Sequence, residues 1–334
     1  MKNLNIALVW TNWDFQNTLI FNLLKKLSKK KIVITSPLKA DFIIYGSYNW
    51  GDPLKTFNIY QLLKKKFFRS SKILDFIRKY EMKLVNYNYF KRSYKPLTLH
   101  YITEFVRNDS LNTDFVISQD LGVQSENHLY DGNWKESCDW SREGIIRPMT
   151  QYPLRIGKFI SIDDLIIPQG DEFLKKNKKV CLITSHLYEP RKTFYDAFSK
   201  HFTVDGYGGW FQKNINPSVF EDYNKVTKLE IMKNYAFNLC PENSIYPGYT
   251  SDRIPTAFIG KCLPITWADQ NINYEFNPKA FVNLNDHFQD NFVSIINNLK
   301  DDNFLRQFTK EPLLLKRPNL EKEIKFVEKI LSCL

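Results

Sequence analysis

The stretch YAFNLCPENSIYPGYTSDRIPTAFIGKCLPITW, from Tyr235 to Trp267, decides the fold class of this 334-residue chain. It begins with an apolar run over 234–239 and ends with another over 262–266, and a polar loop and a short helical stretch lie between them. Short apolar runs bounded by turn residues are typical of buried strands. A helix between two such runs is typical of a parallel α/β sheet, which is the fold class that we expect.

The same alternation extends toward the N-terminus. A strand is expected over 179–184, and a helix is expected over 191–202 behind Pro190, because proline is favoured where a helix begins. An earlier series of apolar and amphipathic runs predicts strands over 5–10, 32–35, 40–45, 97–103 and 114–118 and a helix over 14–30. Two such series predict two domains, since one domain usually holds roughly 100–200 residues.

The boundary between the domains is expected within 147–170, which is rich in turn residues and proline. The first domain is then 1–155, with a basic helical insertion near 55–95. The second domain is 175–305. A C-terminal helical segment, 306–334, is expected to pack back on the first domain through an amphipathic helix over 320–331.

Positive charge is concentrated in one part of the chain. The formal net charge is +11, and the segment from Lys55 to Lys95 alone carries +10, because twelve Lys and Arg residues accompany only Asp75 and Glu81. Aromatic and apolar residues over 57–94 recur at helical spacing. This pattern predicts either binding to an anionic membrane surface or a solvated helical hairpin that covers the first domain. A nucleic-acid-binding protein is a third possibility.

The cysteines and the apolar runs limit the class of protein further. Five cysteines without a C-x-x-C pair predict neither a disulfide framework nor a zinc site, and they indicate a reducing compartment. No apolar run approaches the roughly 18 residues of a membrane span. The run over 6–10 is too short for a signal peptide. We therefore expect a cytoplasmic protein that is either free or peripheral on the inner face of the membrane, and no metal cofactor.

The polar loop and the helix after it concentrate groups that suit a phosphorylated ligand. The start of a helix offers free N–H groups and the positive end of a dipole, and arginine adds a forked cation. Ser251 is expected to cap this helix and Gly260 to end it. The alternative is a capped helix with a solvent-facing pair of Asp252 and Arg253. The candidate residues in this stretch are Glu242, Asn243, Ser244, Tyr249, Ser251, Asp252 and Arg253.

This stretch resembles the signature of the α-1,3/4-fucosyltransferase family, whose bacterial members use GDP-fucose. The family pattern has a Y-K-F strand, an E-N-S or E-N-T triplet, a Y-V-T-E-K run and a later strand that ends in tryptophan or glycine. The matching positions are Tyr235, Phe237, Leu239, Glu242, Asn243, Ser244, Tyr249, Ser251, Asp252, Arg253, Pro264 and Trp267. Pro241, Asp252 and Arg253 depart from the usual Phe, Glu and Lys, and this leaves the donor sugar open.

Other stretches agree with the same resemblance, which covers roughly residues 97–285. Arg191 and Phe194 follow the strand over 179–184 as in the family's R-x-x-F helix, and Arg147-Pro148 lies near the place of an R-x-P motif. The run that ends in Glu104 is similar to the family's Y-T-G-E-N. An ordinary strand-end surface glutamate is the alternative for Glu104.

The resemblance implies an α/β protein with two Rossmann-like domains facing across a cleft, the GT-B type. The first domain would bind the acceptor and the second the GDP-sugar, with Arg191 on the pyrophosphate and Glu104 as general base. The implied reaction is inverting transfer of L-fucose from GDP-fucose to a hydroxyl of a cell-surface glycan, such as lipopolysaccharide O-antigen, capsule or a lipid-linked glycan. No further cofactor and no nucleic acid are expected, and the alternative is another GDP-linked sugar.

Overall fold

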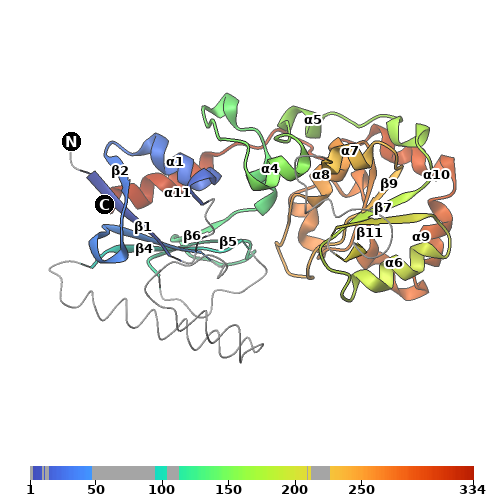
Figure 1. Cartoon of the computed structure of the whole chain (residues 1–334), viewed down its shortest axis with the longest axis horizontal. Coiled ribbons are helices and arrows are strands. Elements are labelled where there is room, and N and C mark those ends of the chain that lie inside the picture. Colours follow the sequence, from blue (N-terminus) through green and yellow to red (C-terminus); the bar gives the residue numbers. More distant parts are fainter. Residues whose placement is uncertain are drawn as a thin grey trace. The chain divides into compact units, whose positions relative to one another are not determined.

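The computed structural model describes residues 3–9, 11, 15–46, 95–103, 113–208, 210–211 and 226–334. The chain divides into two compact units, and each unit has its own parallel sheet (Figure 1). Unit 1 comprises Met1–Ser118, Gly122–Asp131 and Leu320–Leu334, and unit 2 comprises Gln119–Leu121 and Gly132–Asn319. The predicted α/β class with parallel sheets is confirmed.

Unit 1 has a six-stranded sheet in the order β2-β1-β3-β4-β5-β6, in which neighbouring strands pair in parallel. Its strands are β1 (Asn3–Val9), β2 (Lys31–Ile34), β3 (Phe42–Gly46), β4 (Leu97–Tyr101), β5 (Phe115–Ser118) and β6 (His128–Tyr130). A 3-10 turn, Phe15–Asn17, leads into α1 (Leu19–Leu27), whose apolar face is buried. β3, in the middle of the sheet, is buried at all five positions, as is typical of a central strand of a parallel sheet.

The last helix of the chain, α11 (Glu321–Ser332), belongs to unit 1 and lies beside α1 (Figure 1). Val327 and Ile330 on its apolar face are fully buried, and the ring of Phe326 meets that of Phe115 at 5.7 Å. The helix is amphipathic, so this one face supplies its stability. Residues 306–319, which the sequence analysis grouped with this helix, belong to unit 2.

Unit 2 has a five-stranded parallel sheet in the order β11-β10-β9-β7-β8. Its strands are β7 (Val180–Ile183), β8 (Val204–Tyr207), β9 (Phe237–Leu239), β10 (Leu263–Thr266) and β11 (Val282–Asn283). Figure 1 shows α6 (Arg191–Ser199) and α9 (Val293–Asn298) on one side of this sheet, and α7 (Lys228–Met232) and α8 (Arg253–Ile259) on the other. The remaining α-helices of this unit are α4 (Gln151–Ile156), α5 (Ile162–Ile166) and α10 (Asp302–Arg306).

The predicted boundary within 147–170 is wrong, because residues 132–155 belong to unit 2. Trp134 explains why: its indole Nε1 donates to Glu275 Oε2 at 2.8 Å, and its ring packs against Phe276 at 5.4 Å. A buried tryptophan that finds both an apolar partner and a hydrogen bond ties its segment to that core. The chain passes between the units near residues 118–132 and at 319–320.

Two predicted features lie outside the described residues, namely the basic segment 57–94 and Glu104. Three strands were not predicted, β6, β8 and β11, because they are short and carry glycine or polar residues. The helix expected over 191–202 ends earlier, at Ser199. Within the described part of the chain, no helix has the length and apolar character needed to cross a bilayer.

Candidate functional site

The candidate site of unit 2 lies where two neighbouring strands end. Strands β7 and β9 pair in parallel, so their carboxyl ends share one edge of the sheet. Helix α6 begins at Arg191 shortly after β7, and α8 begins at Arg253 after the polar loop that follows β9. Ligands of open α/β sheets bind at this edge. The topology therefore brings two arginines that are distant in sequence to the same place.

Both arginines donate to one amide oxygen. Arg253 Nη2 is 2.8 Å from Asn243 Oδ1, and Arg191 Nη2 donates to the same oxygen. The amide nitrogen of Asn243 in turn donates to the hydroxyl of Tyr249 at 3.0 Å. This arginine pair, Arg191 and Arg253, therefore converges on a single exposed acceptor, and an anion that replaced this oxygen would meet both guanidinium groups.

The charge of Arg191 is only partly compensated. Its Nη1 donates to Thr184 Oγ1 at 3.2 Å and to the backbone oxygen of His186 at 3.4 Å, and both of these acceptors are neutral. Burial and the nearby charge of Arg253 lower the pKa of Arg191 to about 10. The positive charge of each arginine disfavours the charged form of the other. A bound anion would therefore offset the electrostatic repulsion between the two guanidinium groups.

Arg253 is instead held by a buried carboxylate. Glu242 is 1 % exposed, and its Oε2 lies 2.9 Å from Arg253 Nη1, which also donates to the backbone oxygen of Pro241 at 2.9 Å. Burial alone would lower the pKa of Arg253, but the charge of Glu242 and the smaller effects of Tyr249, Asp252 and Cys240 together outweigh burial, and the pKa is raised. Proline at 241 leaves this backbone carbonyl in place, so the departure from the family's Phe removes no acceptor.

Glu242 also organises the turn into α8. Its Oε1 accepts from the backbone N–H of Ser251 at 2.9 Å, and both of its oxygens accept from the Ser251 hydroxyl. Asp252 and not Ser251 occupies the cap position, but the Ser251 hydroxyl accepts from the backbone N–H of Arg253 at 3.4 Å, at the start of the helix. Gly260 ends the helix as predicted. Because its carboxylate accepts all of these hydrogen bonds, the buried Glu242 holds Arg253 and Ser251 in position.

Asp252 is also engaged away from the arginine pair. Its Oδ2 accepts from Lys228 Nζ at 2.9 Å and from the Thr256 hydroxyl at 3.3 Å. Burial opposes the charge of this carboxylate, but the charge and hydrogen bond of Lys228, together with the charge of Arg253 and the hydrogen bond from Thr256, outweigh burial and hold its pKa below the usual range. The solvent-facing pair of Asp252 with Arg253 that the sequence left open is therefore not formed.

Of the two remaining predicted site residues in this loop, Tyr249 is linked to the arginine pair and Ser244 is not. Tyr249 is 4 % exposed and joins the arginine pair through Asn243. Ser244 is half-buried, and its hydroxyl donates to the neighbouring Ile245 oxygen at 3.5 Å. Among the described residues, no three His, Cys, Asp or Glu side chains are grouped so that they could hold a metal ion.

Sequence reasoning missed an aromatic ledge beside Arg191, formed by His186, Tyr188 and Trp210. The rings of His186 and Tyr188 stack at 5.4 Å, and Tyr188 meets Trp210 edge-on at 6.2 Å. Tyr188 is 67 % exposed and Trp210 is 49 % exposed, which is unusual for such large rings. The signal that could have found the ledge is the position of two aromatic residues in loops that follow adjacent strands, β7 and β8.

Comparison with solved structures identifies the class of fold. A crystal structure of an alpha1,3-fucosyltransferase aligns with a TM-score of 0.64 and 20 % identity, over 99 % of this chain and 90 % of that one. A crystal structure of an alpha1,3-fucosyltransferase with GDP-fucose aligns over the same shares, with a TM-score of 0.63 and 19 % identity. The two parallel sheets are thus those of a GT-B glycosyltransferase fold, as the resemblance implied.

The sequence of unit 2 is similar to one known protein family. Residues 173–310 match the model of glycosyltransferase family 10 (fucosyltransferase), C-terminal part. The alpha-(1,3)-fucosyltransferase of Helicobacter pylori is 36 % identical over 110 residues, which are 33 % of this chain and 21 % of that protein. Human 4-galactosyl-N-acetylglucosaminide 3-alpha-L-fucosyltransferase 9 is 27 % identical over 121 residues, 35 % and 31 % of the two chains. The matches thus span about a fifth to a third of these relatives.

Proposed function

We propose that this chain is an inverting glycosyltransferase that transfers L-fucose from GDP-fucose to a hydroxyl of a glycan. The observation that carries this proposal is the arginine pair on Asn243, at the carboxyl edge of a parallel sheet, inside the segment that matches the fucosyltransferase family. Guanidinium groups bind phosphate oxygens through paired, charge-assisted hydrogen bonds. The diphosphate of GDP supplies oxygens that can replace the amide oxygen of Asn243.

The chemistry follows from where charge develops. When the bond between the anomeric carbon and the phosphate oxygen breaks, negative charge grows on the leaving diphosphate. The arginine pair is already oriented by Thr184, Pro241 and Glu242, so it can stabilise this charge without reorganising. The acceptor oxygen forms the new bond from the opposite face of the sugar, and its proton passes to the general base, for which Glu104 remains the candidate.

A donor screen tests the proposal. A ligand that binds only the folded state raises the free energy of unfolding, by about 2.7 kcal/mol at 100 times its Kd. We expect GDP and GDP-fucose to raise the melting temperature of this chain, whereas UDP, CMP and their sugars leave it unchanged. Equal shifts with UDP and GDP, or no shift with GDP, would contradict the proposed donor.

A second donor is favoured by one specific observation. Asp252 stands where the family has glutamate, and its carboxylate is engaged with Lys228 and Thr256. A shorter and occupied carboxylate changes which hydroxyl groups the site can hold, so another GDP-linked sugar is the alternative. The rates of hydrolysis of GDP-fucose and GDP-mannose, measured side by side, distinguish the two.

The location of the enzyme is part of the same proposal. The charge of +10 between Lys55 and Lys95 supports a cytoplasmic enzyme that is peripheral on an anionic membrane face, where a lipid-linked glycan would be its acceptor. Nucleic-acid binding would account for this charge, but it would leave the arginine pair and the family match without a role.

A further inference from the structure

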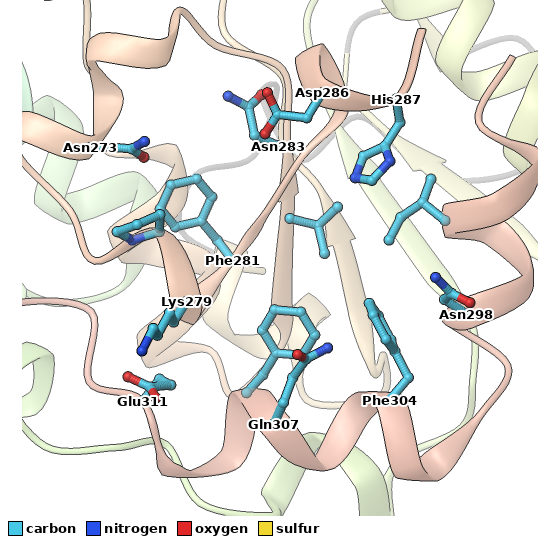
Figure 2. A pocket seen from close by; sticks show the side chains of 14 residues that line it. Asn273, Lys279, Phe281, Asn283, Asp286, His287, Asn298, Phe304, Gln307 and Glu311 are labelled. Carbon is cyan, nitrogen blue, oxygen red and sulfur yellow. The ribbon is translucent and has the colours of Figure 1, made fainter. Parts of the chain in front are cut away.

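Unit 2 contains a groove of about 560 Å³ that shares no residue with the arginine pair or with the loops around it. It lies along β11, the edge strand of the sheet, between the segment 278–283 and the helices α9 and α10 (Figure 2). Its volume falls within the range of about 300–1,000 Å³ that is usual for small-ligand sites. Nothing in the proposed reaction uses it.

Aromatic rings line the middle of this groove, which we call the β11 groove. Phe281 and Phe308 are almost fully buried, and Phe304, half-buried, meets Phe308 edge-on at 5.5 Å. The largely buried rings form a rigid apolar lining that offers ring faces and edges to a ligand. Figure 2 shows Phe281 and Phe304 on opposite sides of the hollow.

Polar side chains surround these rings. The side-chain amides of Asn273, Asn298 and Gln307 are exposed, and none of them is hydrogen-bonded to another described residue. Figure 2 places Asp286 and His287 at one end of the groove and Lys279 and Glu311 at the other. Amides and carboxylates together can both donate to and accept from hydroxyl groups.

The charge of the β11 groove excludes a second phosphate site. Lys279 is outnumbered by Asp286 and Glu311, so these three side chains carry a formal charge of −1, in a chain of formal net charge +11. A diphosphate would be repelled here and attracted to the arginine pair. The chemistry that fits is a neutral, polyhydroxylated ligand whose C–H faces pack on phenyl rings and whose hydroxyls meet amides and carboxylates.

We infer that the β11 groove is a second glycan-binding site, which holds sugar residues of the acceptor remote from the residue that receives the transfer. One end of the groove, at Asp286 and His287, directly follows the carboxyl end of β11, the same sheet edge at which the arginine pair lies. β11 is two strands from β9 and three from β7, which corresponds to about 10–15 Å. A glycan of several sugars spans this distance, whereas a single sugar does not. The inference rests on the proposed function for its choice of glycan.

Direct binding of neutral oligosaccharides tests this inference. The probes are oligomers of one to three 4-galactosyl-N-acetylglucosamine units, titrated into the full chain by calorimetry with and without GDP. The variant Asn298→Ala/Gln307→Ala removes two exposed amides of the groove. Its matched control is Asn297→Ala/Asn303→Ala, two exposed amides on α9 and α10 that do not line the groove. We expect the groove variant to bind the longest oligomer about tenfold more weakly, with the control and GDP binding unchanged.

The outcomes separate this inference from the proposed function. If no oligomer binds, or if the groove variant binds as the wild type does, the β11 groove is not a glycan site even when GDP still binds. If the oligomers bind in the groove but GDP does not stabilise the chain, the proposed donor fails and the groove stands. In transfer assays, a groove variant that loses kcat/KM for long and short acceptors equally would also overturn the inference.

Discussion

At the scale of single residues, the site depends on one amide oxygen that two arginines share. Because charge on the leaving diphosphate grows in the transition state, Arg191→Ala and Arg253→Ala should each lower kcat by roughly 10²–10³-fold and not only raise KM for the GDP-sugar. Steady-state kinetics with the GDP-sugar varied measures this effect. Lys192→Ala, which removes an exposed cation paired with Asp196, is the control and should keep wild-type kcat. An arginine variant with unchanged kcat and KM would show that its side chain takes no part in the reaction.

The ion pair of Asp252 and Lys228 predicts a dependence of stability on pH. The pKa of Asp252 is lowered in the folded chain, so its contribution is present above the unfolded value of about 3.9 and is lost as the pH falls through the folded pKa. At pH 7, Asp252→Asn should lower the free energy of unfolding by about 1.5–3 kcal/mol. The gap to the wild type should close toward pH 3. Urea unfolding at both pH values measures it, with Asp196→Asn, an exposed pair, as the control.

How much of the site could be predicted from the sequence depends on how far apart the interacting residues lie along the chain. Asn243, Tyr249 and Arg253 lie within eleven positions, so one motif places them together. Arg191 could be added because parallel strands end at a common edge. The partnership of Asp252 with Lys228 could not, since an ion pair between two elements leaves no pattern in either sequence. The sequence did not indicate that Glu242 positions Arg253 and Ser251 instead of contacting a ligand. That role follows from the burial of its carboxylate, which depends on how the loop packs.

At the scale of elements, the loops after β7 and β8 carry the aromatic ledge. If its rings stack on the guanine of the donor, Tyr188→Ala and Trp210→Ala should each weaken GDP binding by about 1–3 kcal/mol. Binding of inorganic pyrophosphate, which needs only the arginine pair, should not change. Titrations of both ligands measure this difference. If the variants instead bind GDP normally, the ledge does not contact the base.

Helix α11 stabilises unit 1 through a single apolar face. Ile330 is fully buried, so Ile330→Ala should lower the free energy of unfolding by about 2–5 kcal/mol. Glu328→Ala, on the exposed face of the same helix, should change it by less than about 0.5 kcal/mol. Denaturant unfolding followed by circular dichroism compares the two. Equal effects would mean that α11 contributes little to the packing of unit 1.

Elements with strong local patterns were predicted and the others were not. The strands β3 and β7 are continuous runs of apolar residues, which are typical of the interior of a parallel sheet. Strand β11 has two residues and β8 contains Gly206, so neither has a run to recognise. Both are edge strands, which exist because a neighbour pairs with them. Their pairing is a property of the sheet and not of their own residues.

At the scale of the whole molecule, the net charge of +11 is concentrated between Lys55 and Lys95, and this predicts membrane association. Basic residues near an anionic surface contribute about 1 kcal/mol each, and salt screens them. We expect the chain to float with vesicles that contain phosphatidylserine at low salt and to be released at 0.5 M salt. Vesicles of phosphatidylcholine alone are the control. A chain that stays in solution with both kinds of vesicle would rule out this role of the segment.

The return of the chain to unit 1 has a consequence for how the protein is made. A ribosome synthesises the strands of the first sheet early, yet α11, which lies on α1, is encoded after all of Gly132–Asn319. Unit 2 can therefore complete its core during translation, while the first sheet waits with an uncovered apolar face. During that interval the nascent first unit is the part that chaperones would bind. Premature termination between residues 320 and 330 should accordingly yield insoluble protein, although every residue of unit 2 is present.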